Sequence, residues 1–191
     1  MANVDRPNGL TPIRHLNGSP WNGALTKCFI PATDSTAVFK GDAVVSAGSA
    51  DSDGVPTVAR ASAGGNLRGV VVAFEPVGGD LELLYRPAST AMYAYVCDDP
   101  DVVFMIQEDS VGGALGAANV GNNADLVVGA GDTSSGASNM ELDSSDAIAN
   151  TTAAAQLRIL GLHKTPDNEI GTNAKWEVLI NEHEFKSTTG V

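Results

Sequence analysis

The residues best suited to chemistry in this sequence are acidic. Its densest carboxylate cluster comprises Asp98, Asp99, Asp101, Glu108 and Asp109. Paired carboxylates can act as general acid and base when their surroundings separate their pKa values. The first three, however, flank a proline, and aspartate beside proline favours a turn because its side chain bonds to nearby backbone N–H groups. No nearby basic or aromatic constellation suggests a sugar site, so we expect a turn here and no catalytic residues.

Two other patterns have donor atoms that metals use. A histidine site would require His15, His163 and His183 to converge with one another or with carboxylates. We interpret His183, near the end of a predicted strand, as a solvated side chain. Residues 51–54 (DSDG) begin like a calcium loop, but Ser62 stands where the acidic ligand of the twelfth position is needed. The sequence therefore predicts a hairpin turn at 51–54 and no metal.

Signatures of common enzymes are missing from the sequence. A Walker phosphate loop, a dinucleotide glycine fingerprint, a nucleophile elbow and a zinc-binding His-Glu-x-x-His helix are all absent. The run GAG at 129–131 follows a predicted strand but lacks a third glycine and a strong helix at the required spacing. We predict no enzyme and no cofactor.

Cys28 and Cys97 are far apart in the chain and lie in no metal-binding or redox motif. A disulfide would form only if the two met in space. We favour two small buried residues in strands, as suits a chain made in a cytoplasm.

The charge of the chain restricts its partners. With 11 Lys and Arg against 23 Asp and Glu, the formal net charge is −12. Such a surface repels phosphate backbones, so we expect no nucleic-acid binding. The first 27 residues are the exception, since Arg6, Arg14 and Lys27 outnumber Asp5. The start of the chain lacks the apolar core of a signal peptide, and no apolar run approaches the ~18 residues that cross a bilayer, so no membrane partner is expected.

The elements that must position these residues are predicted to be short strands. Apolar, β-branched and aromatic runs occur at 27–30, 37–40, 43–46, 56–60, 70–74, 81–85, 93–97 and 102–107. Turn signals separate them about every ten residues, the spacing of a sandwich or small barrel. The most apolar pair, residues 93–108, predicts a hairpin in the middle of an all-β core.

Three segments follow from this pattern. Residues 1–24 are rich in Pro, Gly and Asn, which predicts an extended arm without helix or strand. Residues 25–109 form a β-barrel or sandwich core. Residues 110–191 form a second β segment, either separate or packed on the same core, with strands at 124–128, 140–143, 156–162 and 176–182. We expect one helical turn within 110–121 and loose helix within 146–155.

Several short motifs stand out along the chain, namely RPNGLTP at 6–12, HLNG at 15–18, WNG at 21–23, YRPAST at 85–90, the segment 93–108, QEDS at 107–110 and DNEIG at 167–171. Through these motifs the chain resembles small structural proteins encoded beside the major capsid protein of tailed bacteriophages. KGDAVV at 40–45, GVPTV at 54–58 and RGVVV at 68–72 are similar to the small β domain of lambda-like head decoration proteins.

The resemblance implies a decoration, or cement, protein on the outer surface of the virion capsid. Its fold would be β-tulip or jelly-roll-like, its partner the major capsid protein, and its own state a homodimer or homotrimer. The chain is longer than the compact lambda-like type, which leaves the symmetry open. We expect the arm to carry the capsid-binding anchors, namely Arg6, Leu10, Ile13, Arg14 and Trp21, since Trp and Arg are common hot-spot residues.

Two alternatives remain at this point. One is a head-fibre or tail structural component. The other is a carbohydrate-binding β module, for which two Trp and three Tyr offer few exposed aromatic platforms.

Overall fold

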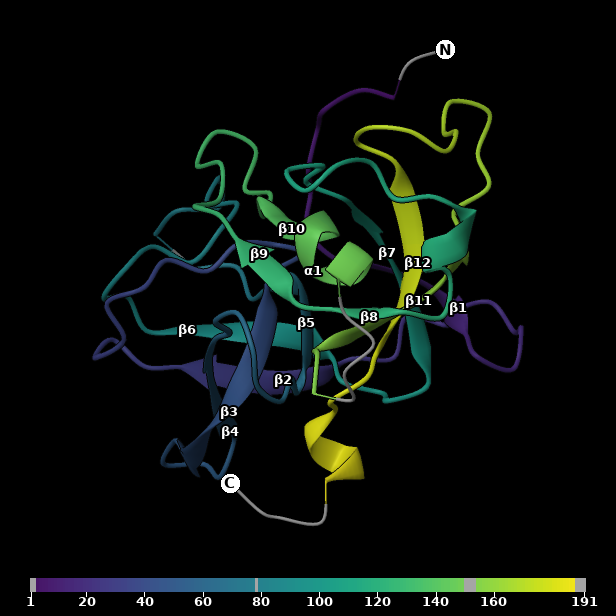
Figure 1. The fold of residues 1–191 in the computed structure, drawn as a ribbon. Helices are drawn as coiled ribbons and strands as arrows, with labels where there is room; N and C mark the ends of the chain where they lie inside the picture. The colour runs from purple at the N-terminus through teal and green to yellow at the C-terminus, as the bar shows by residue number, and fades with distance from the viewer. Residues whose placement is uncertain (1–2, 78, 150–153, 188–191) are drawn as a thin grey trace.

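The structure is a computed structural model that describes residues 3–77, 79–149 and 154–187 (Figure 1). Strands make up 40% of the chain and helix 6%, which confirms the all-β prediction. The strands are β1 (Thr11–His15), β2 (Thr26–Ile30), β3 (Ala43–Ala50), β4 (Pro56–Arg60), β5 (Gly69–Phe74), β6 (Met92–Cys97), β7 (Val102–Gln107), β8 (Asn123–Ala124), β9 (Leu126–Val128), β10 (Met140–Leu142), β11 (Leu157–Leu162) and β12 (Lys175–Ile180). The helical elements are α1 (Ser144–Ala149) and the 3-10 turns η1 (Ala117–Asn119) and η2 (Glu184–Lys186).

Five strands close into a small barrel in the order β2-β4-β3-β5-β6, on the left in Figure 1. β3 and β5 each shift register against a neighbour, β3 between Ser46 and Ala50 and β5 between Val71 and Ala73. Such irregularities bend strands and help a small sheet to close. The barrel encloses a cluster of small and β-branched side chains, namely Cys28, Ile30, Val38, Val44, Val58, Val71, Ala94 and Val96.

The remaining large sheet is open and has the order β1-β7-β12-β11-β8, on the right in Figure 1. β9 and β10 form a separate two-stranded ribbon. A larger hydrophobic cluster lies against this sheet and includes the fully buried Phe104 and Trp176. The cluster takes Leu10 from the predicted arm, Val70 from the predicted barrel and Leu157 from the predicted second segment, so all three segments share one core.

The predicted hairpin of residues 93–108 is wrong, although both of its strands exist. β6 pairs with β2 and β5 in the barrel, whereas β7 pairs with β1 and β12 in the open sheet. The turn at 98–101 is therefore a corner between two sheets. β7 has apolar side chains on both faces and so gains more by entering a second layer than by extending the barrel. Gly69 allows the close approach at this corner, because a Cβ there would stand 2.3 Å from the Cys97 carbonyl oxygen.

Four other predictions need correction, and one is confirmed. Residues 11–15 form β1, so the N-terminal segment is not free of strand. Residues 81–85 form a turn-rich loop, and within 37–40 only Val38 and Lys40 make isolated bridges. The single helical turn expected within 110–121 is confirmed as η1. Helix begins at Ser144 rather than 146, and residues 150–153 of that predicted helix lie outside the described residues.

Candidate interaction surface

The N-terminal segment is attached to its own chain along most of its length. β1 lies antiparallel to β7, with Thr11 opposite Met105 and His15 opposite Val102. The Asn3 side-chain amide donates to two carbonyl oxygens of the 163–174 loop and accepts one N–H from it. Gly9, at φ +68°, packs so tightly that a Cβ would meet Gly41 and Ser138. The segment is therefore a structural strand of the body and not a detached arm.

The five predicted anchors differ in how accessible they are. Leu10 is 1% exposed and belongs to the core, so it is not a surface anchor. Arg14 donates through Nη2 to Glu177 Oε2 at 2.7 Å, so its charge is already paired. Ile13 is half-buried, and Trp21 is half-buried against the large core cluster. Arg6 is exposed and remains available to a partner.

The first three carboxylates of the acidic cluster make hydrogen bonds and ion pairs at the turn between β6 and β7. Asp98 accepts from Thr26 Oγ1 at 2.7 Å and lies 3.3 Å from Arg68 Nη2. Asp101 N donates to Asp99 Oδ1 at 2.9 Å, and the Asp101 side chain pairs with Lys186 at 3.0 Å. These bonds commit Asp98, Asp99 and Asp101 to the corner between the sheets.

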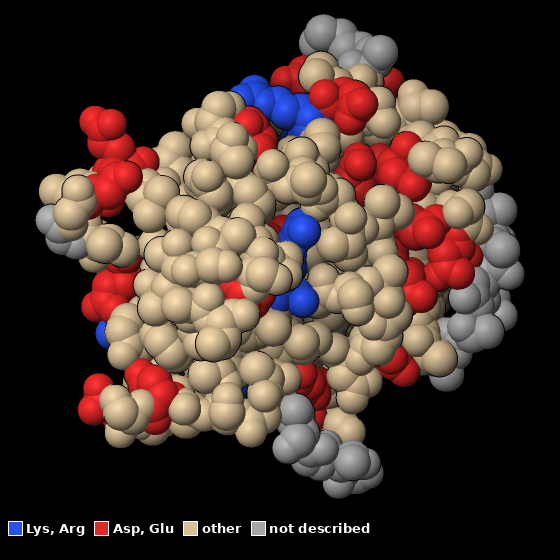
Figure 2. Space-filling model, turned by 90° about the vertical axis from the view of Figure 1, so that its left-hand side faces the viewer, with Lys and Arg blue, Asp and Glu red and all other residues tan. Residues whose placement is uncertain are grey.

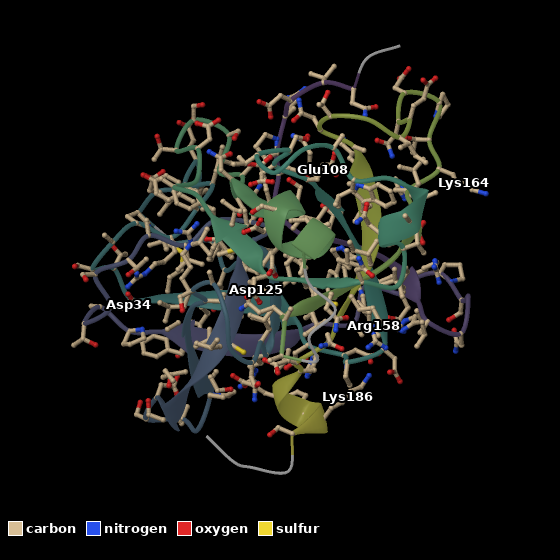
Figure 3. The ribbon with its side chains drawn as sticks, in the orientation of Figure 1. Asp34, Glu108, Asp125, Arg158, Lys164 and Lys186 are labelled. Carbon is tan, nitrogen blue, oxygen red and sulfur yellow. The ribbon has the colours of Figure 1, made fainter. Side chains whose placement is uncertain are left out.

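Glu108, labelled in Figure 3, is fully buried and fully used. Its carboxylate accepts from Leu115 N at 2.9 Å, Ser110 Oγ at 3.1 Å and Trp176 Nε1 at 3.2 Å. Burial raises the pKa of this carboxyl. Because its carboxylate binds the loop that follows β7 and Trp176 of β12, Glu108 fixes the end of β7.

The histidines lie apart as well. His15 Nδ1 is 3.3 Å from Asp99 Oδ2, and His163 Nδ1 is 3.3 Å from Glu177 Oε1. The interpretation of His183 as a solvated side chain is wrong, because it is 2% exposed. Its Nδ1 accepts from Phe185 N at 3.1 Å and begins η2, and burial lowers its pKa. The ring therefore works as a neutral cap inside the protein.

Both cysteines are unpaired and buried, as favoured from the sequence. Burial raises the pKa of Cys28 to about 11 and that of Cys97 to about 12. The thiolate is the reactive form, so neither group is suited to nucleophilic chemistry at neutral pH. The predicted turn at 51–54 is also confirmed, with Asp51 Oδ1 accepting from Asp53 N and Val55 N.

Two buried charges that the sequence did not single out organise the loops at the left of Figure 1. Arg86 is 0% exposed and donates to the carbonyl oxygens of Pro31, Asp34, Thr36 and Thr90. Asp34, at the left in Figure 3, lies in the loop that Arg86 holds. Arginine directly before proline in a polar run was the only signal, and it does not reveal burial.

Asp42 is the second buried charge, and it joins the start of β3 to other segments of the chain. Its carboxylate is buried and accepts from Phe39 N at 2.9 Å, Arg60 Nε at 2.8 Å and Ser138 Oγ at 2.6 Å. Arg60 also donates to the Gly129 carbonyl. Together these bonds join the start of β3 to residues 129–138.

Exposed apolar side chains are found close in sequence to the loops that Arg86 and Asp42 join. Figure 2 looks onto the left-hand side of Figure 1, where uncharged residues predominate, Lys and Arg lie near the centre, and many Asp and Glu lie toward the margin. The surface loop that follows β5 presents Val77, Leu81 and Leu84, which are 39%, 79% and 43% exposed. Large apolar side chains in water mark contact sites when they gather in one place.

Neither metal ligation nor similarity to known proteins adds an assignment. Within residues 3–77, 79–149 and 154–187, no group of three or more His, Cys, Asp and Glu side chains is placed to hold a metal ion. In the same described ranges no helix has both the length and the apolar character to span a membrane. No protein-family model matches the chain, and no curated protein or solved structure is significantly similar to it.

Proposed function

We propose that this protein is a capsid decoration protein, which binds the outer surface of an expanded tailed-phage head as a homo-oligomer and stabilises it. One observation carries the proposal. The segments at 40–45, 54–58 and 68–72 resemble the small β domain of lambda-like decoration proteins, and in the structure they lead into or form β3, β4 and β5. These three strands are neighbours in a closed small barrel, in the order β4-β3-β5.

The physical requirements of a cement protein fit this molecule. Such a protein needs complementary area and no reaction chemistry, and a standard specific interface buries about 1,600 Å². A rigid body with loops fixed by Arg86 and Asp42 loses little conformational entropy on docking. The net charge of −12 disfavours contact with DNA, as suits a protein that is made in the host cytoplasm and joins the head from outside.

The attachment of the N-terminal segment changes which surface we assign to capsid binding. Leu10 and Arg14 are committed to the protein's own core and sheet, so the arm alone does not supply the anchors. Of the predicted anchors, Arg6 has the most exposed side chain, with Ile13 and Trp21 half-buried. We therefore propose that the body presents the main contact surface and that Arg6 adds to it at the edge.

Co-sedimentation with expanded heads that lack decoration protein tests the function. The expected result is saturable binding at a fixed ratio to the major capsid protein, with the ratio indicating dimer or trimer sites. Binding to unexpanded shells is the control and is expected to be weaker. A folded, monodisperse protein that fails to bind expanded heads would overturn the decoration role and favour a head-fibre or tail component, or a carbohydrate-binding module.

A further inference from the structure

Three of the exposed large apolar side chains of the protein lie within eight residues. Leu81 is 79% exposed, Leu84 is 43% exposed and Val77 is 39% exposed. The sequence pattern suggested a strand at 81–85, whose side chains would be half-buried. In the structure this stretch is instead a surface loop, so leucines that a strand would cover face the solvent. We call Val77 together with residues 79–84 the apolar loop.

The apolar loop also carries negative charge. Asp80 and Glu82 are exposed, and within the described residues neither makes an ion pair. Asp80 N donates to Val77 O at 3.0 Å, and Asp80 Oδ1 accepts from Glu82 N at 3.1 Å, so the acidic residues close the turn that displays Leu81. The loop thus offers an apolar centre with carboxylates beside it.

The base of the apolar loop is fixed on both sides. On the incoming side, Glu75 N donates to Tyr93 O at 2.9 Å and Glu75 pairs with Lys27 at 2.8 Å. On the outgoing side, the Tyr85 ring stacks on Phe39 with centroids 4.7 Å apart and an interplanar angle of 8°. Leu84 itself lies so close to Gly136 that a Cβ on that glycine would stand 2.5 Å from the Leu84 Cβ.

Arg86 completes this support from directly behind the loop. Its N–H and carbonyl exchange hydrogen bonds with Val38 at 2.8 Å and 3.0 Å, and its guanidinium binds four carbonyls. A loop held in this way presents Leu81 without a large ordering cost at the moment of binding. Exposure of Leu81 to water is unfavourable in the unbound protein, and burial of this side chain against a partner would recover that free energy.

We propose that the apolar loop is the element that docks onto the capsid, and that it inserts Leu81 into an apolar pocket rimmed by lysine and arginine on the major capsid protein. The proposal rests on the decoration function above and names the surface that performs it. Asp80 and Glu82 select the basic rim, since opposite charges steer docking and like charges oppose it. A second copy of this chain, with a net charge of −12, and anionic membranes or nucleic acids are disfavoured by the same carboxylates.

Two substitutions with matched controls test the apolar loop on the full-length protein. Leu81→Asp removes the apolar anchor, and Val111→Asp, at a residue 81% exposed in a different loop, controls for a new surface charge. Glu82→Lys reverses a charge of the apolar loop, and Asp167→Lys reverses an exposed charge in the 163–174 loop. Binding to expanded heads is titrated by co-sedimentation at low and high salt, with thermal unfolding measured for every variant.

The expected result is that Leu81→Asp weakens binding about tenfold or more, as for a buried interface anchor. Glu82→Lys is expected to weaken binding about threefold and to reduce its dependence on salt, while both controls stay within about twofold of the original protein. All four variants should unfold at the original temperature. Hydrogen exchange of the backbone amides of residues 79–84 should be slower in the protein bound to heads than in the free protein.

The possible failures are distinguishable. If the original protein binds heads but Leu81→Asp binds equally well, or Val111→Asp is weakened as much, the docking proposal is overturned and the decoration function stands. Binding to heads that leaves hydrogen exchange of the amides of residues 79–84 unchanged would lead to the same conclusion. If the original protein binds no heads, the decoration function fails and the docking proposal falls with it.

Discussion

Buried polar residues hold the loops of this protein in place. Arg86 and Asp42 are both inaccessible to solvent, and each joins segments that are far apart in sequence. A buried guanidinium that binds four carbonyls satisfies groups that would otherwise lose their water without compensation. The loops around the barrel therefore depend on single side chains.

Replacing Arg86 by methionine should lower the free energy of unfolding by about 3–5 kcal/mol, because four buried carbonyl oxygens lose their donor. Urea unfolding monitored by fluorescence measures this change. Arg158→Met is the matched control, since Arg158 is exposed, and it should cost under about 1 kcal/mol. Equal effects of the two substitutions would contradict the role assigned to Arg86.

Leu10 provides a second test at the scale of one side chain. Leu10→Ala should destabilise the protein by about 2–4 kcal/mol, because a side chain 1% exposed leaves a cavity in the large cluster. Leu16→Ala, at a residue 49% exposed, is the control and should change stability by under about 1 kcal/mol. A Leu10 variant as stable as the control would mean that the segment is not docked in solution.

Glu141 predicts how stability depends on pH. Gln107 Nε2 bonds to both Asp5 at 3.0 Å and Glu141 at 3.4 Å, and burial, with Asp5 and Asp109 nearby, raises the pKa of Glu141 from 4.5 to about 7. Between those values the folded protein holds a proton that the unfolded chain has released. The free energy of unfolding should therefore fall as the pH rises through this window.

Glu141→Gln should remove that fall. At pH about 8 the variant should be more stable than the original protein by about 1–2 kcal/mol, after discounting for partial exposure, with a smaller difference at pH about 5. Chemical denaturation at both pH values measures it. A difference that is the same at both pH values would argue against a raised pKa.

At the scale of elements, the path of the chain between two sheets is the main feature. β6 completes the barrel and β7 enters the open sheet, so the turn at 98–101 connects the two hydrophobic layers. β1 then covers one edge of β7, and β12 covers the other. Because β1 pairs with β7, the N-terminal segment is joined to the open sheet directly after the turn at 98–101.

Deleting residues 2–15 should therefore damage the body itself. The deletion exposes the edge of β7 and removes Leu10, so we expect a lower unfolding temperature and concentration-dependent aggregation through the open edge. Scanning fluorimetry with light scattering measures both. A fully stable 2–15 deletion would restore the interpretation of a detached arm.

At the scale of the whole molecule, charge separates self-association from partner binding. Copies that each carry a formal charge of −12 repel one another, whereas the basic-rimmed capsid pocket that we propose would attract them. Raising salt from about 50 to about 500 mM screens both effects, since the Debye length falls from about 14 to about 4 Å. Analytical ultracentrifugation should then show tighter oligomers, while co-sedimentation should show weaker binding to heads. If higher salt strengthened both self-association and binding to heads, or weakened both, this account would be contradicted.

The local pattern determined the secondary structure well because strands and turns depend on neighbouring residues. Apolar and β-branched runs predicted β2, β4 and β5, and partly alternating apolar residues predicted β11 and β12, all within two residues of their observed bounds. The acidic turns at 51–54 and 98–101 form as turns. The buried, unreactive cysteines also followed from composition. The local sequence pattern therefore predicts which segments form strands and which form turns.

Tertiary structure alone decided which strands pair and which side chains are left in water. The same apolar pattern places Leu10 in the core and Leu81 on the surface, because only Leu10 meets a neighbouring layer. β6 pairs with β2 and β5 in the barrel, whereas β7 pairs with β1 and β12 in the open sheet, and these partners are distant in sequence. Burial of Arg86, Asp42 and His183 likewise depends on loops that are distant in sequence, so no local pattern could have revealed them.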